Sequence, residues 1–445
     1  MKIRNLFTSL ILFFVISSFL LNAQVKHPEW SYNKTIYEVN IRQYTPEGTF
    51  NAFKKHLPEL KQMGVGILWL MPINPIGEKN RKGSLGSYYS VKDYLKVNPE
   101  FGTFDDFKSL VNEVHENGMY IIIDWVANHT SWDNPLVNEH PDWFTKDSVG
   151  NFVLPIPEWT DVIDLNYDNK DLWEWMTDAL SYWVKECNID GYRCDVAGMM
   201  PTEFWLQARP KLNKIKPVFM LAEWETVEMH KAFDMTYSWD LYRITNDIAK
   251  EKADAEKITK YFDSVETKYP KSAFRMRFTS NHDENTWNGT EFDRLGDAAE
   301  TFVVFDAIIP GMLLIYNGQE AGNQKRLEFF EKDPIKWGKD HKFRSLYTNL
   351  IKLKKDNKAL WNGEKGGAIS FLKNDKDKEV LSFLREKNGN KVVGIFNLTE
   401  DDVDVNIEGK GLKGNYKNFA DDEKTNISDK ITLTLKPWEY KVYYK

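Results

Sequence analysis

The sequence predicts an α/β fold, a closed (β/α)8 barrel of the TIM type, followed by a small antiparallel β domain. From about residue 35 to residue 353, short β-branched or aromatic runs alternate with amphipathic helical stretches. Eight such units follow one another, and this alternation favours a closed parallel barrel over an open doubly wound sheet. After about residue 366 the hydrophobic period changes to two, as in antiparallel strands.

The eight strands are expected as apolar runs separated by polar loops. They are residues 36–41, 66–71, 119–125, 191–195, 218–222, 235–239, 277–281 and 312–316. Helices are expected between them where apolar residues recur at the spacing of one helix face. Examples are residues 50–63, 104–117, 172–186 and 298–309.

A long segment after the third strand interrupts this alternation. Residues 129–169 are rich in Pro, Asp and Trp and lack helical periodicity. Loops of this length in compact domains are usually functional or disordered. We therefore expect an excursion over the mouth of the barrel.

The C-terminal segment carries a clear hairpin signal. Residues 380–384 and 392–396 flank Asn388-Gly389, a dipeptide typical of tight hairpin turns. Ile431, Leu433 and Leu435 alternate with polar residues near the chain end. The predicted division is a barrel over residues 24–365, with its insertion at about 129–169, and a β domain over residues 366–445.

The first residues have the pattern of a secretory signal. Lys2 and Arg4 precede a mostly apolar run over residues 6–21, and the small residue Ala23 follows it. This order is typical of a signal peptide, predicted here over residues 1–23. A retained membrane anchor is the alternative. We expect a secreted or periplasmic protein that does not contact the membrane once the signal is removed.

The composition limits the classes of molecule that the protein is expected to bind. The chain of 445 residues has a formal net charge of −7 and no basic stripe, so nucleic acid is not expected as a partner. The 16 Trp fit either stacking on sugar rings or a large core. Cys187 and Cys194 lack the spacing of a zinc site. One bridge between them is the alternative, and we expect buried free thiols.

Polar residues gather where several predicted strands end. In a barrel, the carboxyl ends of the strands meet at one rim, where barrel enzymes carry their active sites. Chance charges at the rim are the alternative, but charged groups at the end of an apolar run are costly unless paired. The third, fourth, fifth and seventh strands lead, in order, into His129, Arg193 with Asp195, Glu223, and His282 with Asp283.

Asp195 and Glu223 suit the cleavage of an acetal by two carboxyl groups. Arg193 lies two residues before Asp195, so both side chains point to the same face of the strand. The guanidinium is expected to depress the pKa of Asp195, as a nucleophile needs. A structural ion pair is the alternative. The apolar and aromatic neighbours of Glu223 tend to raise its pKa, as a general acid needs.

Four segments resemble the ordered signature regions of the α-amylase family, glycoside hydrolase family 13. They are DWVANHT, DGYRCDVAG, MLAEWE and FTSNHDEN, while GVGILWLMPINP, VIDLNYDN and GMLLIYNGQEAG resemble accessory regions. The resemblance covers nearly the whole chain after the signal. It implies a short inserted domain after strand three, a C-terminal antiparallel β-sandwich, and a double displacement that retains the α configuration without a redox or nucleotide cofactor.

The resemblance also implies roles for single residues. Asp195 matches the family's nucleophile, Glu223 its acid/base and Asp283 its third carboxylate, which holds substrate hydroxyls. The remaining matches bind the sugar at the cleavage subsite, and Tyr89 stacks on that sugar. These substrate-binding residues are Tyr89, His129, Arg193 and His282.

The sequence departs from many α-amylases just after the nucleophile. Where they carry a Lys-His pair that touches the sugar beyond the cleavage point, this chain has Gly198 and Met199. Because that His also helps to hold calcium, the usual calcium site is in doubt. Asn128 remains, either as a calcium ligand or as an amide bonded to backbone. We expect no metal site and no required cofactor; calcium is open but not expected.

The sequence therefore predicts a secreted, retaining hydrolase of α-1,4-linked glucans or maltooligosaccharides. A transglycosylase or isomerase of the same family, working through the same glycosyl-enzyme, is the alternative. A catalytically inactive sugar-binding protein is a remote alternative, because all three carboxylates are retained. Chain-length preference, linkage tolerance, endo or exo action and oligomeric state stay open.

Overall fold

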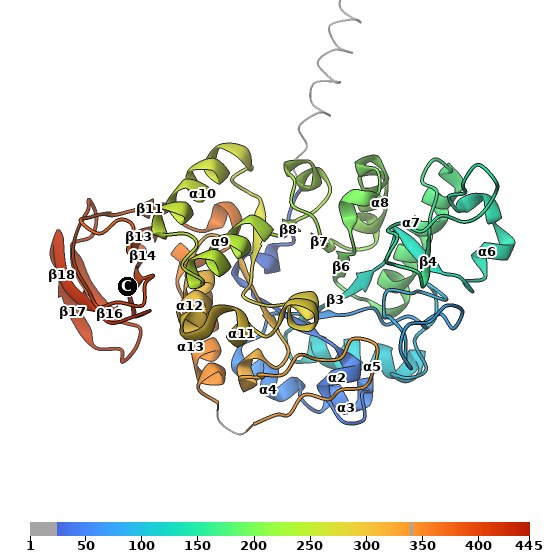
Figure 1. Cartoon of the computed structure of the whole chain (residues 1–445), viewed down its shortest axis with the longest axis horizontal. Helices are drawn as coiled ribbons and strands as arrows, with labels where there is room; N and C mark the ends of the chain where they lie inside the picture. Colours follow the sequence, from blue (N-terminus) through green and yellow to red (C-terminus); the bar gives the residue numbers. More distant parts are fainter. Residues whose placement is uncertain (1–24, 339–340) are drawn as a thin grey trace, which may run out of the picture.

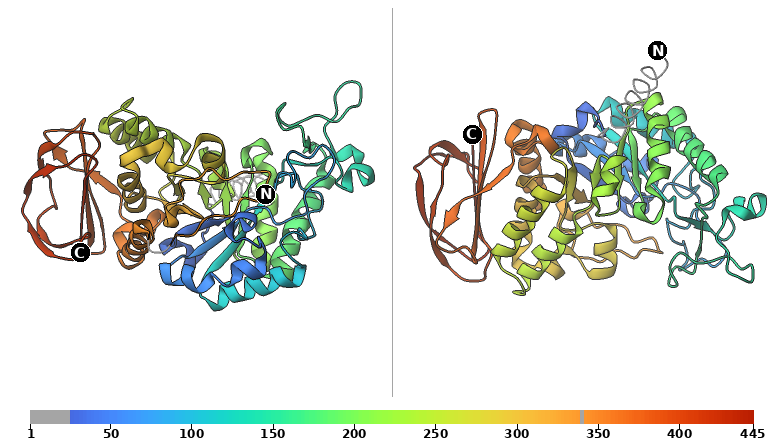
Figure 2. Two further views of the ribbon diagram at one scale, coloured as in Figure 1. Left: turned by 60° about the horizontal axis from the view of Figure 1, so that its bottom comes forward. Right: turned by 90° about the horizontal axis from the view of Figure 1, so that it is seen from above.

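A computed structural model describes residues 25–338 and 341–445. The predicted signal peptide, residues 1–23, lies outside the described residues. The inserted segment and the C-terminal β domain lie on opposite sides of the barrel (Figures 1 and 2). Within the described ranges, no helix is both long and apolar enough to cross a membrane.

Parallel strands close the barrel in the order β1-β10-β9-β8-β7-β6-β3-β2. The prediction of an eight-stranded parallel barrel is confirmed. The ring is closed because β1 pairs with both β2 and β10. The strands are β1 (Ile36–Val39), β2 (Ile67–Leu70), β3 (Tyr120–Trp125), β6 (Gly191–Cys194), β7 (Phe219–Ala222), β8 (Met235–Thr236), β9 (Phe274–Arg277) and β10 (Met312–Tyr316).

Side chains that alternate in direction along each barrel strand contribute to two buried clusters, one inside the barrel and one between the barrel and its helices. In β2, Ile67 and Trp69 belong to the buried cluster that fills the barrel, while Leu68 and Leu70 pack outward with the helices. This is the alternation that a strand in a small barrel requires, because successive side chains point to opposite faces. Both faces are buried, so the strand is a continuous apolar run.

Helices surround the barrel, with short 3₁₀ turns between them. The helices are α2 (Ile41–Tyr44), α3 (Phe50–Lys54), α4 (Leu57–Met63), α5 (Phe104–Glu116), α6 (Leu136–Glu139), α7 (Lys170–Cys187), α8 (Thr202–Ile215), α9 (Trp239–Ala249), α10 (Ala255–Lys268), α11 (Glu291–Leu295), α12 (Ala299–Ile308) and α13 (Lys342–Asp356). The 3₁₀ turns are Glu29–Asn33, Pro141–Trp143, Ala197–Met199, Val227–Lys231, Gly296–Ala298, Gln319–Ala321, Lys358–Leu360 and Gly363–Lys365.

Two predicted elements differ from the structure. The helix expected at 50–63 is split into α3 and α4, because Pro58 at the start of α4 has no N–H to continue a helix. The seventh strand, expected at 277–281, is β9 and already ends at Arg277, where its pairing with β10 stops. His282 and Asp283 therefore follow an irregular segment and not the strand end itself.

The insertion is a small folded excursion. β4 (His129–Ser131) pairs antiparallel with β5 (Val162–Asp164) at its base. Between them lie only α6, one 3₁₀ turn and irregular chain, as the missing helical periodicity indicates. The hairpin base brings the start and the end of the excursion together above the barrel rim.

The C-terminal domain consists of two antiparallel sheets that share one core. Their orders are β11-β13-β14-β19-β16-β17 and β12-β15-β18, and side chains from both sheets form one buried cluster. The other face of the larger sheet packs on α12, where Phe305 contacts Phe383 and Phe396. The predicted sandwich is confirmed. Its strands are β11 (Ile369–Phe371), β12 (Lys373–Asn374), β13 (Val380–Lys387), β14 (Asn390–Asn397), β15 (Val403–Glu408), β16 (Gly414–Asn418), β17 (Lys424–Ile427), β18 (Lys430–Leu435) and β19 (Tyr440–Tyr444).

The cysteines are as predicted. Cys187, at the end of α7, and Cys194, at the end of β6, are both buried and free.

Candidate active site

Strands β6 and β7 place Asp195 and Glu223 side by side at the barrel rim. Backbone hydrogen bonds continue one step beyond the strand ends. The N–H of Asp195 donates to Trp125 O at 2.9 Å, and the N–H of Glu223 donates to Cys194 O at 3.0 Å. Both carboxyl groups are therefore carried on backbone that the sheet holds rigidly.

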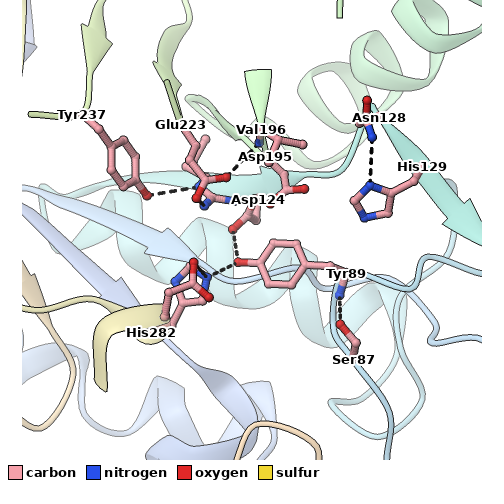
Figure 3. A network of polar contacts seen from close by, with 12 residues as sticks. Ser87, Tyr89, Asp124, Asn128, His129, Asp195, Val196, Glu223, Tyr237 and His282 are labelled. Atoms are coloured by element: carbon pink, nitrogen blue, oxygen red, sulfur yellow. Dashed lines mark hydrogen bonds and ion pairs between the residues drawn. The ribbon is translucent and has the colours of Figure 1, made fainter. Parts of the chain in front are cut away.

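Arg193 lies at the centre of the charged groups. Its Nη1 donates to Asp124 Oδ1 at 2.8 Å and to Asp195 Oδ1 at 3.0 Å. Its Nη2 forms an ion pair with Glu223 Oε1 at 2.9 Å. The guanidinium is fully buried, so a single cation faces three carboxylates with little solvent to screen them. The three carboxylates, those of Asp124, Asp195 and Glu223, are labelled in Figure 3.

This excess of carboxylates changes the expected pKa of Asp195. Burial and the neighbouring Glu223 carboxylate raise the pKa of Asp195 well above its ordinary value, although Arg193 lowers it. The expectation of a depressed pKa is therefore wrong, because burial and the Glu223 carboxylate outweigh the effect of the one guanidinium. Burial also raises the pKa of Glu223, as its apolar neighbours predict.

His282 and Tyr89 extend the network across the rim. The hydroxyl of Tyr89 donates to Asp124 Oδ2 at 3.0 Å and lies 2.8 Å from His282 Nε2. On its other side, His282 Nδ1 lies 2.5 Å from Glu38 Oε1. Burial lowers the pKa of His282, but the carboxylates of Asp283 and Glu38 raise it to about 9. A protonated His282 donates from both ring nitrogens, so its Nε2–H donates to the Tyr89 oxygen.

His129 lies on the side of the site formed by the insertion. Burial lowers its pKa to about 3, so the ring is neutral at ordinary pH. Its Nδ1 lies 3.3 Å from the amide nitrogen of Asn128, and its ring contacts Trp159 of the insertion at 5.3 Å. The site thus holds one neutral and one cationic histidine.

These residues border a cavity of about 320 Å³. Six of the seven predicted site residues line it, and Arg193 lies buried behind them. The insertion and the loops after β2, β9 and β10 supply most of the rest of the wall. The predicted residues on its lining are Tyr89, His129, Asp195, Glu223, His282 and Asp283, and the aromatic residues are Trp159, Trp287, Phe329 and Phe330.

Sequence reasoning did not single out several residues that shape the site. Asp124 holds Arg193 and Tyr89, and Glu38 holds His282. Both stand inside apolar strand runs, IIIDW and IYEV, and a lone acid there is a signal for a buried ionic network. The aromatic residues of the cavity lie in irregular loops, so no periodicity indicated them.

Trp287 reaches the cavity through an unusual turn. Residues Glu284–Asn288 form a single π turn, a local feature that often occurs at functional sites. It brings the indole Nε1 of Trp287 to 3.2 Å from Asp283 Oδ1. Half of Trp287 is exposed, so part of its ring surface is accessible to solvent beside Asp283.

Trp224 fills the space beside Gly198. A Cβ added at Gly198 would lie 2.2 Å from the Trp224 ring. Any side chain at position 198 would therefore collide with the indole. The lack of a side chain at Gly198 thus makes room for the Trp224 indole, which directly follows Glu223 in sequence.

The described residues do not form an obvious metal site. They contain no group of three or more His, Cys, Asp or Glu side chains placed to hold a metal ion. The amide of Asn128 contacts His129 Nδ1, and its backbone carbonyl accepts the N–H of Leu165. The amide nitrogen of Asn128 therefore contacts a ring nitrogen and not the backbone that the structural alternative expects.

Comparison with known proteins identifies the family. The sequence matches the family profile described as "Alpha amylase, catalytic domain" over residues 27–149 and 136–379. The chain belongs to the α-amylase family. A second profile, "Bacterial Alpha amylase C-terminal domain", matches residues 371–438. The comparisons confirm the predicted family and the predicted class of enzyme, an α-amylase-type glycoside hydrolase. They also agree with the barrel fold.

Relatives within the α-amylase family differ in what their names describe. A crystal structure described as a noncanonic maltogenic alpha-amylase from Thermotoga neapolitana is 31% identical, with 93% of this chain and 98% of that chain covered and a TM-score of 0.85. "Alpha-amylase 2" of Dictyoglomus thermophilum is 25% identical over 87% of this chain and 75% of its own length. "Alpha-1,4-glucan:maltose-1-phosphate maltosyltransferase" of Picrophilus torridus is 27% identical over 84% of this chain and 62% of its own length. Hydrolysis and glycosyl transfer are thus both represented.

Proposed function

We propose that this protein is a secreted, retaining α-glycoside hydrolase that cleaves α-1,4-linked glucans or maltooligosaccharides. The observation that carries the proposal is the contact of one buried guanidinium, Arg193, with both Asp195 and Glu223. Two carboxyl groups held on neighbouring strands can act on the two atoms of one glycosidic bond, one on the anomeric carbon and the other on the leaving oxygen. The site belongs to a family whose relatives carry names of glucan-active enzymes.

The proposed reaction is a double displacement. A carboxylate oxygen of Asp195 attacks the anomeric carbon, while Glu223 donates its proton to the glycosidic oxygen and the leaving sugar departs. Glu223 then takes a proton from water, the water oxygen attacks the anomeric carbon, and the bond to Asp195 breaks. The product keeps the α configuration because the carbon is inverted twice.

The raised pKa of Glu223 fits its role as proton donor, whereas Asp195, whose pKa is also raised, must be ionised before it attacks. The resting site is too rich in carboxylates for all of them to be ionised easily, so a proton is held there. In the proposal, that proton resides on Glu223 when substrate is bound, and Arg193 stabilises the ionised Asp195. Asp283, which lies beside His282 at 3.5 Å, is proposed to hold hydroxyls of the sugar.

Tyr89 and the histidines are proposed to position the donor sugar. The ring of Tyr89 offers a stacking face, and half-buried aromatic rings bind the apolar faces of sugars well. His129 presents a neutral ring to a sugar hydroxyl, whereas His282, whose two N–H groups bond Glu38 and Tyr89, holds the Tyr89 hydroxyl in place beside the sugar. The reaction as proposed uses no metal and no cofactor.

Variants of the two carboxyl groups test the proposal. Asp195→Asn and Glu223→Gln are each expected to lower turnover of maltoheptaose about 10²–10⁴-fold, the usual size of acid–base effects, with unchanged melting temperatures. Glu228→Gln, an exposed carboxylate in the same region, is the matched control. Proton NMR of the first product is expected to show the α anomer. Turnover within about tenfold of wild type, or a β product, would exclude the assignment.

Transfer to a sugar acceptor is the second candidate. The arrangement of Trp224 beside Gly198 leaves an indole next to the proposed acid/base, and an aromatic face there would hold an acceptor sugar. Product analysis at high maltooligosaccharide concentration distinguishes the two candidates. Products longer than the substrate indicate transfer, and products only shorter than the substrate indicate hydrolysis.

A further inference from the structure

One side of the cavity is bordered by three chain segments that bind one another, which we call the closed end. They are residues 82–85 after β2, residues 158–161 of the insertion, and residues 329–331 after β10, and all three supply residues to the cavity lining. We infer that this closed end blocks the donor side of the site, so that the enzyme cleaves from the non-reducing chain end. The inference rests on the proposed function and adds an exo mode of action to it.

The aromatic part of the closed end begins behind Tyr89. The ring of Phe329 lies parallel to that of Tyr89, with centroids 6.1 Å apart, and Phe330 meets Phe329 edge-on at 5.2 Å. Trp287 packs on Phe329 at 5.5 Å. These rings form a continuous wall that starts at the proposed stacking residue.

The loop after β2 is bound directly to this wall. The N–H of Leu85 donates to Phe330 O at 3.1 Å, and the N–H of Ser84 donates to Glu331 Oε1 at 2.7 Å. Gly83 has φ 61°, and a Cβ there would lie 2.4 Å from Phe330 Cβ. The loop therefore lies in close contact with the wall, and this contact fixes the position of Lys82.

Lys82 joins the wall to the insertion. Its Nζ donates to Glu158 O at 2.7 Å and forms an ion pair with Asp161 Oδ1 at 3.2 Å. The Asp161 side chain is only 6% exposed, and its backbone carbonyl accepts the hydroxyl of Ser90 at 3.0 Å. The cation thus bridges two segments that border the cavity from different sides.

The chemistry of the reaction orients this closed end. Glu223 must protonate the oxygen that leaves, so the leaving sugar lies on the Glu223 side. The donor ring lies over Tyr89, and a glucan continues from the O4 of that ring toward its non-reducing end. In this inference, that direction leads past Tyr89 toward Phe329 and Lys82, which line the same cavity. The cavity of about 320 Å³ lies at the small end of the roughly 300–1,000 Å³ range of ligand sites, which suits a short chain end.

An end-blocked substrate tests the mode of action. Wild-type protein is given a nitrophenyl maltoheptaoside and the same compound with a benzylidene group on its non-reducing sugar. Loss of the intact compound is followed by chromatography, because cleavage near the non-reducing end does not release the chromophore. The blocked compound is expected to react at least about tenfold more slowly, because the closed end would clash with the benzylidene group. Equal rates on the two compounds would overturn the inference. Failure on both compounds would instead count against the proposed function.

Variants of Lys82 test the bridge. Lys82→Ala is expected to raise the blocked-to-unblocked rate ratio about tenfold. Lys82→Met, which keeps the stem but loses the Nζ contacts, is expected to raise it as well. Lys79→Ala is the matched control, because Lys79 is an exposed cation of the same loop that packs over Trp132 and does not line the cavity. An unchanged ratio in both folded Lys82 variants would overturn the role of the bridge.

Discussion

The backbone N–H of Val196 donates a hydrogen bond of 2.8 Å to Oε2 of Glu223 (Figure 3). Val196 directly follows Asp195 and has φ 36° and ψ 45°, a left-handed conformation that is unfavourable for a β-branched residue. Such strain persists only where the surrounding structure imposes it. The chain that carries the proposed nucleophile therefore also orients the proposed acid/base.

Replacing Val196 by glycine is expected to separate stability from activity. Glycine adopts positive φ without penalty, so the free energy of unfolding is expected to stay within about 1 kcal/mol of wild type or to rise. The N–H is then held less firmly, and because this hydrogen bond lowers the pKa of Glu223, the basic limb of the pH profile should move to higher pH.

The measurement for Val196→Gly combines a thermal melt with the pH dependence of kcat/KM. Turnover is expected to fall about tenfold, the size of one weakened hydrogen bond to a charged group. Val196→Ala, which keeps a Cβ, is the matched control. A lower melting temperature with an unshifted pH profile would mean that the residue acts only through packing.

The charge of His282 is expected to make stability depend on pH. The pKa of His282 is about 9 in the folded protein, against 6.5 ordinarily. A raised pKa contributes stability that is fully present below about 6.5 and is lost as the pH rises through about 9. The free energy of unfolding should therefore decline across this window.

Removing the His282 side chain provides the comparison. His282→Asn leaves Glu38 buried without its cationic partner, so it should lower the free energy of unfolding by about 3 kcal/mol below pH 6.5. Denaturant unfolding at several pH values measures both effects. Equal pH dependence in wild type and variant would show that His282 is not the titrating group.

The two parts of the Tyr89 side chain are expected to have separate effects. Tyr89→Phe removes hydrogen bonds to Asp124 and His282, and it should lower kcat and cost about 1–3 kcal/mol of unfolding free energy. Tyr89→Ala removes the ring as well and should also raise KM. Steady-state kinetics and melts on both variants are the check; equal KM values for the two would contradict stacking on the sugar.

Position 198 is expected to be coupled to Trp224. A side chain at Gly198 would overlap the indole, and overpacking of this kind costs about 1–3 kcal/mol. Gly198→Ala should therefore destabilise the wild-type background and have much less effect in Trp224→Ala. A double-mutant cycle of unfolding free energies measures the coupling. If the two changes in unfolding free energy simply add, residues 198 and 224 are not in contact in solution.

Activity is expected not to require calcium. Met199 replaces the family's calcium-linked His, and the Asn128 side chain contacts His129 Nδ1. Any ligand that binds only the folded state raises its stability by mass action. Chelator treatment should thus leave both the melting temperature and the activity unchanged. A loss of either that added calcium restores would reveal a site, formed by carbonyl oxygens that leave no trace in sequence.

Periodicity predicted the barrel well because each strand is buried on both faces. The ends of elements were less predictable. Thr279 and Ser280 sit in the run expected as the seventh strand, but the Thr279 hydroxyl bonds Glu291, and no pairing with β10 extends beyond Arg277. Local propensity does not contain such a tertiary contact.

The site residues were predictable where a motif carries them, and their ionisation was not. The pKa of Asp195 depends on how many carboxylates surround Arg193, and Asp124 comes from a different strand. The positive φ of Val196 has no signature in sequence, since valine is among the least expected residues there. Lys82 and Phe329 lie in irregular loops, and only the folded chain brings them to the same cavity.

The pairing of β1 with β10 delays the completion of the barrel during synthesis. Ile36 pairs with Leu314, so the earliest strand keeps one open edge until β10, which ends at residue 316 of 445, has been made. Contacts between such distant segments carry a large closure entropy and form slowly. An unpaired edge is also a template for pairing with other chains. A nascent or truncated chain that lacks β10 is therefore open to aggregation at that edge, and the closed ring protects the finished enzyme from it.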